Sequence, residues 1–353
     1  MGGGFLGAEL AKSLDQVADV TLIEQNSHFV QAPAMIRAVV TPSLLDKALI
    51  PYDDLLTRGA VVQDRAVSIN ESGVELQSGQ FIEADYIVVA TGSSNAIPFK
   101  PNGSDIEAFR AANSQVNKQL VKADSVVIVG AGAVGAELAG EITHHMPEKN
   151  VTLISSTRAL FPEQPEKLGR ELTRKLRASG VELVMGARVE NLQSMTEPYS
   201  GTVKLSNGRE IEADLIFPVI GSKAASGLLD NLPDIKKSNA NRVVVDGWMR
   251  PSSLPNVFAA GDIADMGDAM TVVASGRQKE WLAKTLTALS EGKQFDAIKT
   301  YKPWKKAPIL VPLGPDKGNS FLIFCTAGDF ITRKMKGEDL FLTKYNKIFG
   351  RTA

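Results

Sequence analysis

The chain has 353 residues, of which 44% are hydrophobic and 22% are charged, as in soluble globular proteins. It carries 39 Lys and Arg against 40 Asp and Glu, so its charge gives no reason to expect nucleic acid as the main partner. The single cysteine, Cys325, excludes an internal disulfide framework and a Cys-x-x-Cys redox pair, and fits a reducing compartment such as the cytoplasm. The length predicts two or three domains.

The first predicted element is a glycine turn at the start of the chain. Gly2, Gly4 and Gly7, in MGGGFLGAEL, have the G-x-G-x-x-G spacing of a dinucleotide-binding turn. In such a turn the backbone and the N-terminus of the following helix bind a pyrophosphate. A buried strand should come before the turn, but only Met1 precedes Gly2. We therefore expect the first strand of this unit to be missing.

The next predicted strand, VTLIE, ends at Glu24. An acid at this position binds the ribose hydroxyls of a dinucleotide, although a surface acid can also simply end a strand. Further along, Ser78-Gly79 predicts a hairpin turn, and Asn207-Gly208 predicts a second one later in the chain. The apolar run after this turn ends in Ala90-Thr91-Gly92.

A second and more complete copy of this pattern begins at residue 125. The run SVVIV (125–129) predicts a buried strand, and Gly130, Gly132 and Gly135 follow it before a helix-forming stretch. The segments GAELA and VTLI occur in both copies, and VELQSGQFIEADYIVVATGS (74–93) parallels VKLSNGREIEADLIFPVIGS (203–222), which contains Gly221. The chain therefore contains two related βαβ domains, and Met1 aligns with Val129.

The second copy differs from the first where the ribose would bind. Ser155 takes the place of the acid, and Arg158 follows three residues later. Without the acid, discrimination against a 2′-phosphate is weaker, and Arg158 can pair with that phosphate. We expect NADPH to be accepted, and the alternative is that Arg158 only points into solvent.

A third signal is NVFAAGDIAD (256–265), in which a strand ends at Gly261-Asp262 before the predicted helix that contains ASGRQKEWLAKTL. With the two glycine turns and Ala90-Thr91-Gly92, this pattern resembles the flavoproteins that have two dinucleotide-binding domains. Within that superfamily the chain resembles the NAD(P)H:quinone oxidoreductases of the ferroptosis-suppressor and apoptosis-inducing-factor-like group. The stretches MPEKNVTLISS (146–156) and KMKGEDLFLTKYNKIFG (334–350) support this resemblance.

The resemblance implies cofactors and roles for particular residues. FAD would bind to the first domain and NAD(P)H to the second, with hydride passing to the flavin and electrons to a quinone. Asp262 would hold the ribityl chain of FAD. Glu137 would face the nicotinamide and flavin as the catalytic residue, although favourable placement in the helix dipole also explains an acid there. Arg37 would help to hold FAD, or would be an ordinary surface arginine, and no metal site is expected.

The predicted fold class is α/β, with two Rossmann-like domains and a small C-terminal α+β domain. The FAD domain would comprise residues 1–97 and 222–296, with the NAD(P)H domain (98–221) inserted into it and residues 297–353 forming the C-terminal domain. The apolar run FLIFC (321–325) predicts a strand in that last domain.

The end of the chain is basic, and its basic residues are Lys334, Lys336, Lys344, Lys347 and Arg351. By the resemblance, this region would line a quinone entrance, form a homodimer contact or touch a membrane surface. The membranes expected for a peripheral contact are the lipid droplet, the mitochondrial outer membrane and the plasma membrane. A solvated basic helix is the simpler alternative.

Two other functions stay open from the residues alone. One is a reductase of a protein electron carrier such as ferredoxin or rubredoxin, or a type II NADH dehydrogenase on a membrane. A carrier protein needs a charged docking face, whereas a quinone needs an apolar pocket. The other is a non-catalytic NAD(P)-binding protein that acts as an apoptosis effector.

Overall fold

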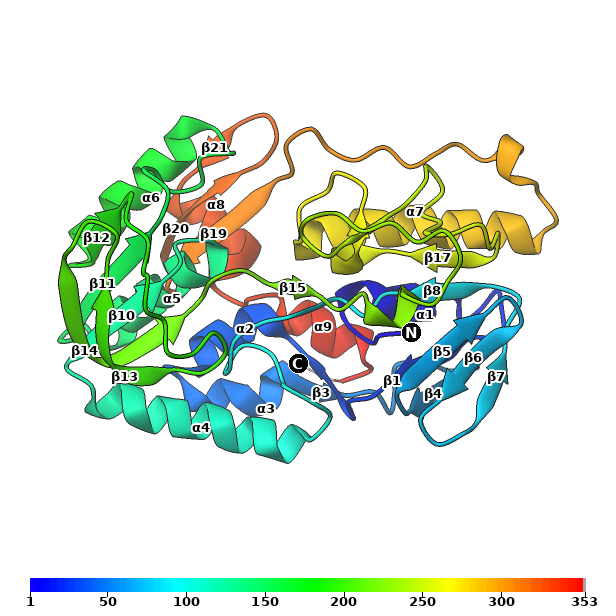
Figure 1. Ribbon diagram of the computed structural model, residues 1–353, viewed down its shortest axis with the longest axis horizontal. Helices are drawn as coiled ribbons and strands as arrows, with labels where there is room; N and C mark the ends of the chain where they lie inside the picture. The colour runs from blue at the N-terminus through cyan, green and yellow to red at the C-terminus, as the bar shows by residue number, and fades with distance from the viewer. Residues whose placement is uncertain (352–353) are drawn as a thin grey trace.

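The structure, a computed structural model, describes residues 1–351. Figure 1 shows two sheet-containing regions that lie side by side along the long axis of the molecule, with helices packed around them. The C-terminal segment, drawn in orange and red, runs from one region to the other. The predicted α/β class is confirmed. Within residues 1–351, no helix is both long and apolar enough to cross a membrane.

The second region is built on a five-stranded sheet in the order β12-β11-β10-β14-β13, parallel except for β13. Its strands are β10 (Ser125–Val129), β11 (Asn150–Ser155), β12 (Glu182–Met185), β13 (Tyr199–Lys204) and β14 (Glu210–Pro218). Its helices are α4 (Ile106–Lys122), α5 (Ala133–His145) and α6 (Glu166–Ala178). The predicted strand SVVIV is therefore the central strand of the sheet.

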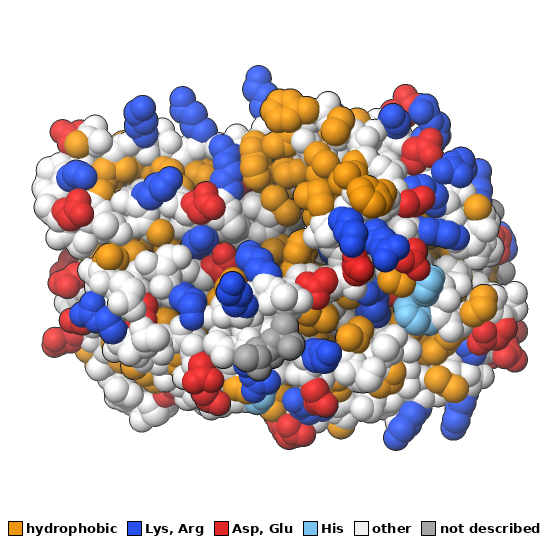
Figure 2. Space-filling view, turned by 180° about the vertical axis from the view of Figure 1, so that it is seen from behind, with side chains coloured by type: hydrophobic (Ala, Val, Ile, Leu, Met, Phe, Trp, Pro, Cys, Tyr) orange, Lys and Arg blue, Asp and Glu red, His pale blue; other side chains and the backbone are white. Residues whose placement is uncertain are grey.

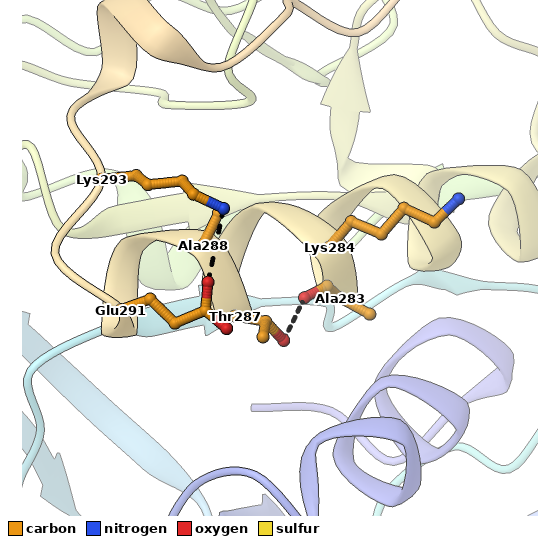
Figure 3. Close-up of a pocket in the computed structure, with 6 residues that line it drawn as sticks. All are labelled: Ala283, Lys284, Thr287, Ala288, Glu291 and Lys293. Carbon is orange, nitrogen blue, oxygen red and sulfur yellow. Dashed lines mark hydrogen bonds and ion pairs between the residues drawn. The ribbon is translucent and has the colours of Figure 1, made fainter.

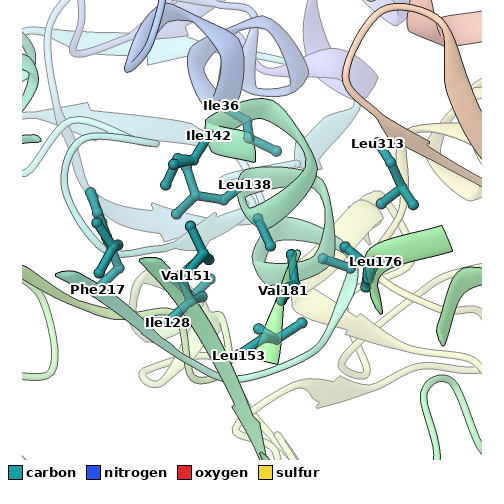
Figure 4. Packing of buried hydrophobic residues seen from close by; sticks show 14 of the residues in the cluster. Ile36, Ile128, Leu138, Ile142, Val151, Leu153, Leu176, Val181, Phe217 and Leu313 are labelled. Atoms are coloured by element: carbon teal, nitrogen blue, oxygen red, sulfur yellow. The ribbon is translucent and has the colours of Figure 1, made fainter. Parts of the chain in front are cut away.

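The side chains of β10 alternate between the two faces of the sheet, and both faces are buried. Ile128 belongs to the core formed with the helices, whereas Val127 and Val129 belong to a second core on the opposite face. Figure 4 shows Leu138 and Ile142 of α5 close to strand residues of the helix-covered face. Elements from elsewhere in the chain join this core, including Ile36 from the N-terminal region and Leu313 from the C-terminal segment.

The first region contains two separate parallel pairs, β1 (Thr21–Glu24) with β4 (Ala60–Gln63), and β8 (Ile87–Val89) with β17 (Val257–Ala259). Met1 lies between β1 and β8. The Gly2 N–H donates to the Ile23 carbonyl (2.9 Å), and the Ala90 N–H donates to the Met1 carbonyl (2.8 Å). In the second region, Gly130 N–H and Val219 N–H make the same two bonds, to Ile154 and Val129. Met1 therefore occupies the position of Val129, as the repeat predicts.

The remaining elements of the first region surround these strands. Helix α1 (Phe5–Leu14) packs against α7 (Val272–Ser290), which corresponds to the helix predicted after Gly261-Asp262. The smaller elements are β2 (His28–Val30), α2 (Ala32–Ala38), η1 (Pro42–Leu44), α3 (Leu45–Ala48), β3 (Leu49–Pro51), β5 (Ala66–Asn70), β6 (Gly73–Leu76), β7 (Phe81–Glu83), β9 (Ser93–Ser94), β15 (Lys223–Ala224), η2 (Gly227–Leu229), β16 (Val243–Val244), η3 (Gly261–Ile263), β18 (Ala264–Asp265) and η4 (Phe295–Ala297). The hairpin turns predicted at Gly79 and Gly208 are confirmed, and both glycines have positive φ angles.

The C-terminal segment packs on both regions. Its elements are β19 (Ile309–Leu313), β20 (Lys317–Phe321), β21 (Thr326–Ala327), α8 (Asp329–Thr332), the π-helical turn η5 (Arg333–Gly337) and α9 (Leu342–Ile348). Strand β19 packs on α5, whereas Tyr345 of α9 stacks on Phe29 of the first region, with ring centroids 5.2 Å apart. The prediction of a strand over 321–325 is wrong beyond Phe321, because the chain turns at 322–325 into β21. The domain boundaries stay predictions.

Candidate functional site

The two glycine turns have the same backbone geometry. Gly2 and Gly130 have φ angles of +91° and +113°, in the region that glycine alone adopts easily. A Cβ atom at Gly7 would collide with the carbonyl oxygen of Gly2, and one at Gly135 would collide with that of Gly130. The first and third glycines of each turn are therefore required by the tight turn and by the close approach of the helix to it.

The middle glycine of each turn faces open space. Gly4 and Gly132 are the N-caps of α1 and α5, with φ, ψ of −70°, −166° and −73°, −169°. Apart from the adjacent residues and the helix's own backbone, no atom lies within 4 Å of a Cβ placed on either one, and neither glycine has a side chain to cap its helix. The first N–H groups of both helices are available to an anion, so both turns fit the pyrophosphate of a dinucleotide.

Glu24 is held beside the first turn. Its Oε2 accepts a hydrogen bond from Gly3 N–H (2.6 Å), and its Oε1 accepts from the backbone N–H and side-chain amide of Asn26 (2.8 and 2.7 Å). The carboxylate is partly exposed at the end of β1. This is the position and the chemistry needed to accept ribose hydroxyls.

The corresponding place in the second region is less acidic. Ser155 is buried at the end of β11, and its Oγ lies 2.9 Å from Thr157 Oγ1. Arg158 is exposed and forms no ion pair with any residue in 1–351. The structure therefore leaves the Arg158 guanidinium available to a phosphate group.

In each region a later strand, β8 or β14, ends beside the glycine turn, and the glycines that follow these two strands have matching backbone angles. Ala90 packs directly against Gly2, since a Cβ at Gly2 would collide with the Ala90 carbonyl. Gly92 and Gly221 have φ angles of +70° and +68°. Thr91 Oγ1 donates to the Ala225 carbonyl (2.7 Å), which joins the two crossings between the regions.

Asp262 lies next to the residues that follow Ala90-Thr91-Gly92. Its Oδ2 accepts a hydrogen bond from Ser93 Oγ (2.6 Å), and Lys100 Nζ lies 3.9 Å from the same oxygen and donates to Ser93 Oγ (2.8 Å). Burial lowers the pKa of Lys100. Gly261 N–H donates to Gln278 Oε1 of α7 (2.7 Å), which fixes the loop. Sequence reasoning did not find Lys100, because no motif marks it.

Glu137 is buried at the start of the second turn of α5, and its partner comes from the far end of the chain. Lys336 Nζ, in η5, donates to Glu137 Oε1 (2.6 Å) and to the Leu310 carbonyl (3.3 Å). Burial raises the pKa of Glu137, and the positive charge of Lys336 opposes that rise. The sequence signal for Lys336 was only its membership of a basic segment.

Arg37 is buried, so the alternative of an ordinary surface arginine is wrong. Its Nε and Nη2 atoms donate to both carboxylate oxygens of Glu141 (2.8–3.0 Å), and Nη2 also donates to the Gly337 carbonyl (2.7 Å). Its role toward FAD stays a prediction. Glu137 and Glu141 lie one helical turn apart, so α5 presents two buried carboxylates, each with its own cation.

The hollow shown in Figure 3 lies elsewhere, along α7. It has a volume of about 320 Å³ and is lined by Ala283, Lys284, Thr287, Ala288, Glu291 and Lys293. None of the predicted site residues lines it. The candidate site is therefore defined by the glycine turns and the charged residues around them.

Comparison with known sequences gives a consistent family. The pyridine nucleotide-disulphide oxidoreductase family matches residues 54–292. Apoptosis-inducing factor homolog B of Dictyostelium discoideum is 30% identical over 368 residues, which cover 98% of this chain and 94% of the relative. Ferroptosis suppressor protein 1 of Xenopus tropicalis is 29% identical over 362 residues, which cover 100% and 95%.

Solved structures share the fold. The sulfide:quinone oxidoreductase of Aquifex aeolicus superposes with a TM-score of 0.77 at 16% identity, covering 99% of this chain and 91% of that one. A ferredoxin reductase from Rhodopseudomonas palustris superposes with a TM-score of 0.65 at 20% identity, covering 85% and 76%. The family match spans more than half of the chain. The chain belongs to the pyridine nucleotide-disulphide oxidoreductase family and is an FAD-dependent NAD(P)H oxidoreductase.

Proposed function

We propose that the protein passes a hydride from NAD(P)H to bound FAD and electrons onward to a quinone-type acceptor. The observation that carries the proposal is the pair of matching glycine turns, one in each region, each with an uncapped helix N-terminus. The single cysteine supports an acceptor other than a disulfide within the chain. The name of one structural neighbour, the sulfide:quinone oxidoreductase, supports a quinone.

In this proposal the first turn and the loop at Asp262 hold FAD. Gly2, Gly4 and Gly7 would let the pyrophosphate approach α1, and Glu24 would bind the ribose. Ala90-Thr91-Gly92 and Gly261-Asp262 would hold the flavin end, supported by the bond that joins Asp262 to Ser93. The flavin and the nicotinamide supply the redox chemistry when bound.

NAD(P)H would bind at the second turn. Gly130, Gly132 and Gly135 offer the same backbone and helix terminus as the first turn, and Gly221 repeats the geometry of Gly92. Ser155 and Arg158 would meet the adenosine ribose. The exposed guanidinium supports use of NADPH as well as NADH.

Glu137 is the proposed catalytic residue, and Lys336 orients it. Reduction of a quinone to a quinol by NAD(P)H consumes one proton in addition to the hydride. A buried carboxyl whose pKa is raised holds a proton at less acidic pH than an exposed glutamate does, which suits it to deliver that proton. The hydrogen bond from Lys336 fixes the carboxyl in one orientation.

The acceptor is tested by NAD(P)H oxidation with the FAD-loaded protein. A soluble ubiquinone analogue is expected to sustain turnover, because a small quinone needs no protein docking face. Turnover is followed by loss of NAD(P)H absorbance, in parallel assays with the quinone and with a ferredoxin. Turnover with the ferredoxin alone would contradict the quinone proposal.

Replacing Arg158 with Ala is expected to weaken the use of NADPH selectively, because only NADPH carries the 2′-phosphate. We expect KM for NADPH to rise by up to about fivefold, which corresponds to the ~1 kcal/mol of a strong exposed ion pair, with KM for NADH unchanged. Arg170→Ala, which removes another exposed arginine of the same region, is the control. Equal losses for both nucleotides would remove Arg158 from the phosphate site.

Glu137→Gln is expected to remove one inflection from the pH dependence of quinone reduction. In the unchanged protein, activity should fall as pH rises through the raised pKa of Glu137, because the proton that the carboxyl delivers is then lost. Lys336→Met should move this inflection to higher pH, since the opposing positive charge is gone. The exposed Glu148→Gln is the control. An unchanged pH profile in Glu137→Gln would exclude the proposed role.

A further inference from the structure

The C-terminal segment exposes an unusual group of hydrophobic side chains. Within residues 1–351, twelve large hydrophobic side chains are exposed, and five of them lie between residues 323 and 335. Phe324 is 95% exposed and Phe330 is 72% exposed; the other three are Ile323, Ile331 and Met335. Scattered single residues of this kind need no explanation, but a local group indicates a binding surface.

These side chains are presented by an ordered turn and not by a loose loop. Phe321 pairs with Thr326 across β20 and β21, so Ile323 and Phe324 lie at the tip of the hairpin. Leu322 N–H donates to the Cys325 carbonyl (2.8 Å), which closes the turn. Helix α8 follows directly and packs on β20, so Phe330 and Ile331 lie beside the same hairpin.

A basic segment runs at the same end of this small sheet. Ile309 of β19 pairs with Phe321 of β20, so the residues before β19 approach the hairpin tip. In that stretch Lys302, Lys305 and Lys306 are exposed, and none forms an ion pair with a residue that the structure describes. Figure 2 views the molecule from the side opposite to Figure 1, and on that side hydrophobic side chains gather in the upper part, with Lys and Arg side chains projecting beside them.

We propose that this surface, here called the hairpin surface, binds an anionic lipid bilayer. It consists of Lys302, Lys305, Lys306, Ile323, Phe324, Phe330, Ile331 and Met335. The apolar side chains would enter the boundary between headgroups and acyl chains, while the lysines would contact anionic headgroups. Apolar tips flanked by unpaired lysines complement both layers of such a membrane.

Most of the basic end of the chain is already paired within the protein. Lys334 pairs with Glu338, Lys336 with Glu137 and Lys344 with Glu9. Arg333, beside Lys334, also lies within ion-pair distance of acids. These four cations are paired with acids of the protein itself, and of the basic end only Lys347 and Arg351 form no ion pair within residues 1–351. We therefore assign the membrane contact to the segment before β19, which carries three unpaired lysines.

A second copy of the chain fits the hairpin surface less well. In a two-fold dimer the same surface of each copy would meet, and the lysines at 302, 305 and 306 would face their own like charges. The phenylalanines also stand at a projecting tip. A bilayer supplies negative charge and a soft apolar layer together, and so accommodates both features.

Membrane binding would place the active site next to lipid. Met335 of the hairpin surface directly precedes Lys336, which donates to Glu137. A lipid-dissolved quinone would then reach the protein from the bilayer. This consequence rests on the proposed function, whereas binding to the bilayer does not.

The test is co-sedimentation of the full chain with vesicles of phosphatidylcholine, with and without phosphatidylglycerol. We expect binding to the anionic vesicles, and a loss of about fivefold in affinity for each lysine removed by Lys305→Gln or Lys306→Gln. Phe324→Ser with Phe330→Ser should weaken binding to both kinds of vesicle. The controls are Lys118→Gln with Lys122→Gln, and Val67→Ser with Phe81→Ser, which alter exposed residues of other elements.

Two further measurements keep the outcome unambiguous. In Phe324→Trp, the fluorescence of the added tryptophan should be quenched by brominated lipids if the tip enters the bilayer. The rate of soluble-quinone reduction should be unchanged in all of these variants. Equal binding by the phenylalanine variant and its control would overturn the proposal. So would a shift from dimer to monomer in sedimentation velocity on loss of the phenylalanines, without vesicle binding by the unchanged protein. If the unchanged protein fails to reduce the soluble quinone, the proposed quinone acceptor is contradicted, but binding to the bilayer is not.

Discussion

The structure depends on two buried carboxylates on α5, each of which needs a cation from another part of the chain. Glu137 and Glu141 lie one turn apart and are both buried, so they repel each other whenever both are charged, and a nearby cation offsets this repulsion. Arg37 comes from α2 of the first region, and Lys336 comes from η5 of the C-terminal segment. The removal of one partner from such a buried pair typically costs about 3–5 kcal/mol. These two pairs therefore hold two distant segments against one helix, and the second glycine turn lies at the N-terminus of that helix.

A second constraint is the repeated glycine turn, which limits what each region can bind. In both copies the first glycine needs a positive φ angle and the third allows no side chain, so the backbone is determined at these positions. The middle glycine leaves the helix N-terminus open to an anion. The copies differ where the ribose would lie, with Glu24 at one and Ser155 followed by Arg158 at the other. Two turns with similar backbone geometry can thus bind two dinucleotides whose adenosine riboses are contacted differently.

Local patterns were predictable from the sequence, and long-range partners were not. The two turns, the hairpins at Gly79 and Gly208 and the place of Met1 follow from spacing within short segments and from the repeat. The pair formed by Lys336 and Glu137 joins residues 199 positions apart, and nothing in the basic C-terminal segment distinguishes that lysine from its neighbours. Apolar composition alone predicted a strand over 321–325, although Ile323, Phe324 and Cys325 are exposed at a turn.

The most direct test of the account is anaerobic mixing of the FAD-loaded protein with NADH, with and without Gly132→Asp. Aspartate is a favourable N-cap, and a Cβ at this position meets no atom within 4 Å outside the adjacent residues and the helix's own backbone. The variant should therefore fold, with its carboxylate in the anion site of α5. NADH is expected to bleach the flavin band at ~450 nm in the unchanged protein. The variant is expected to retain FAD and to stay oxidised. Bleaching of the variant at the rate of the unchanged protein would contradict the assignment of NAD(P)H to the second turn.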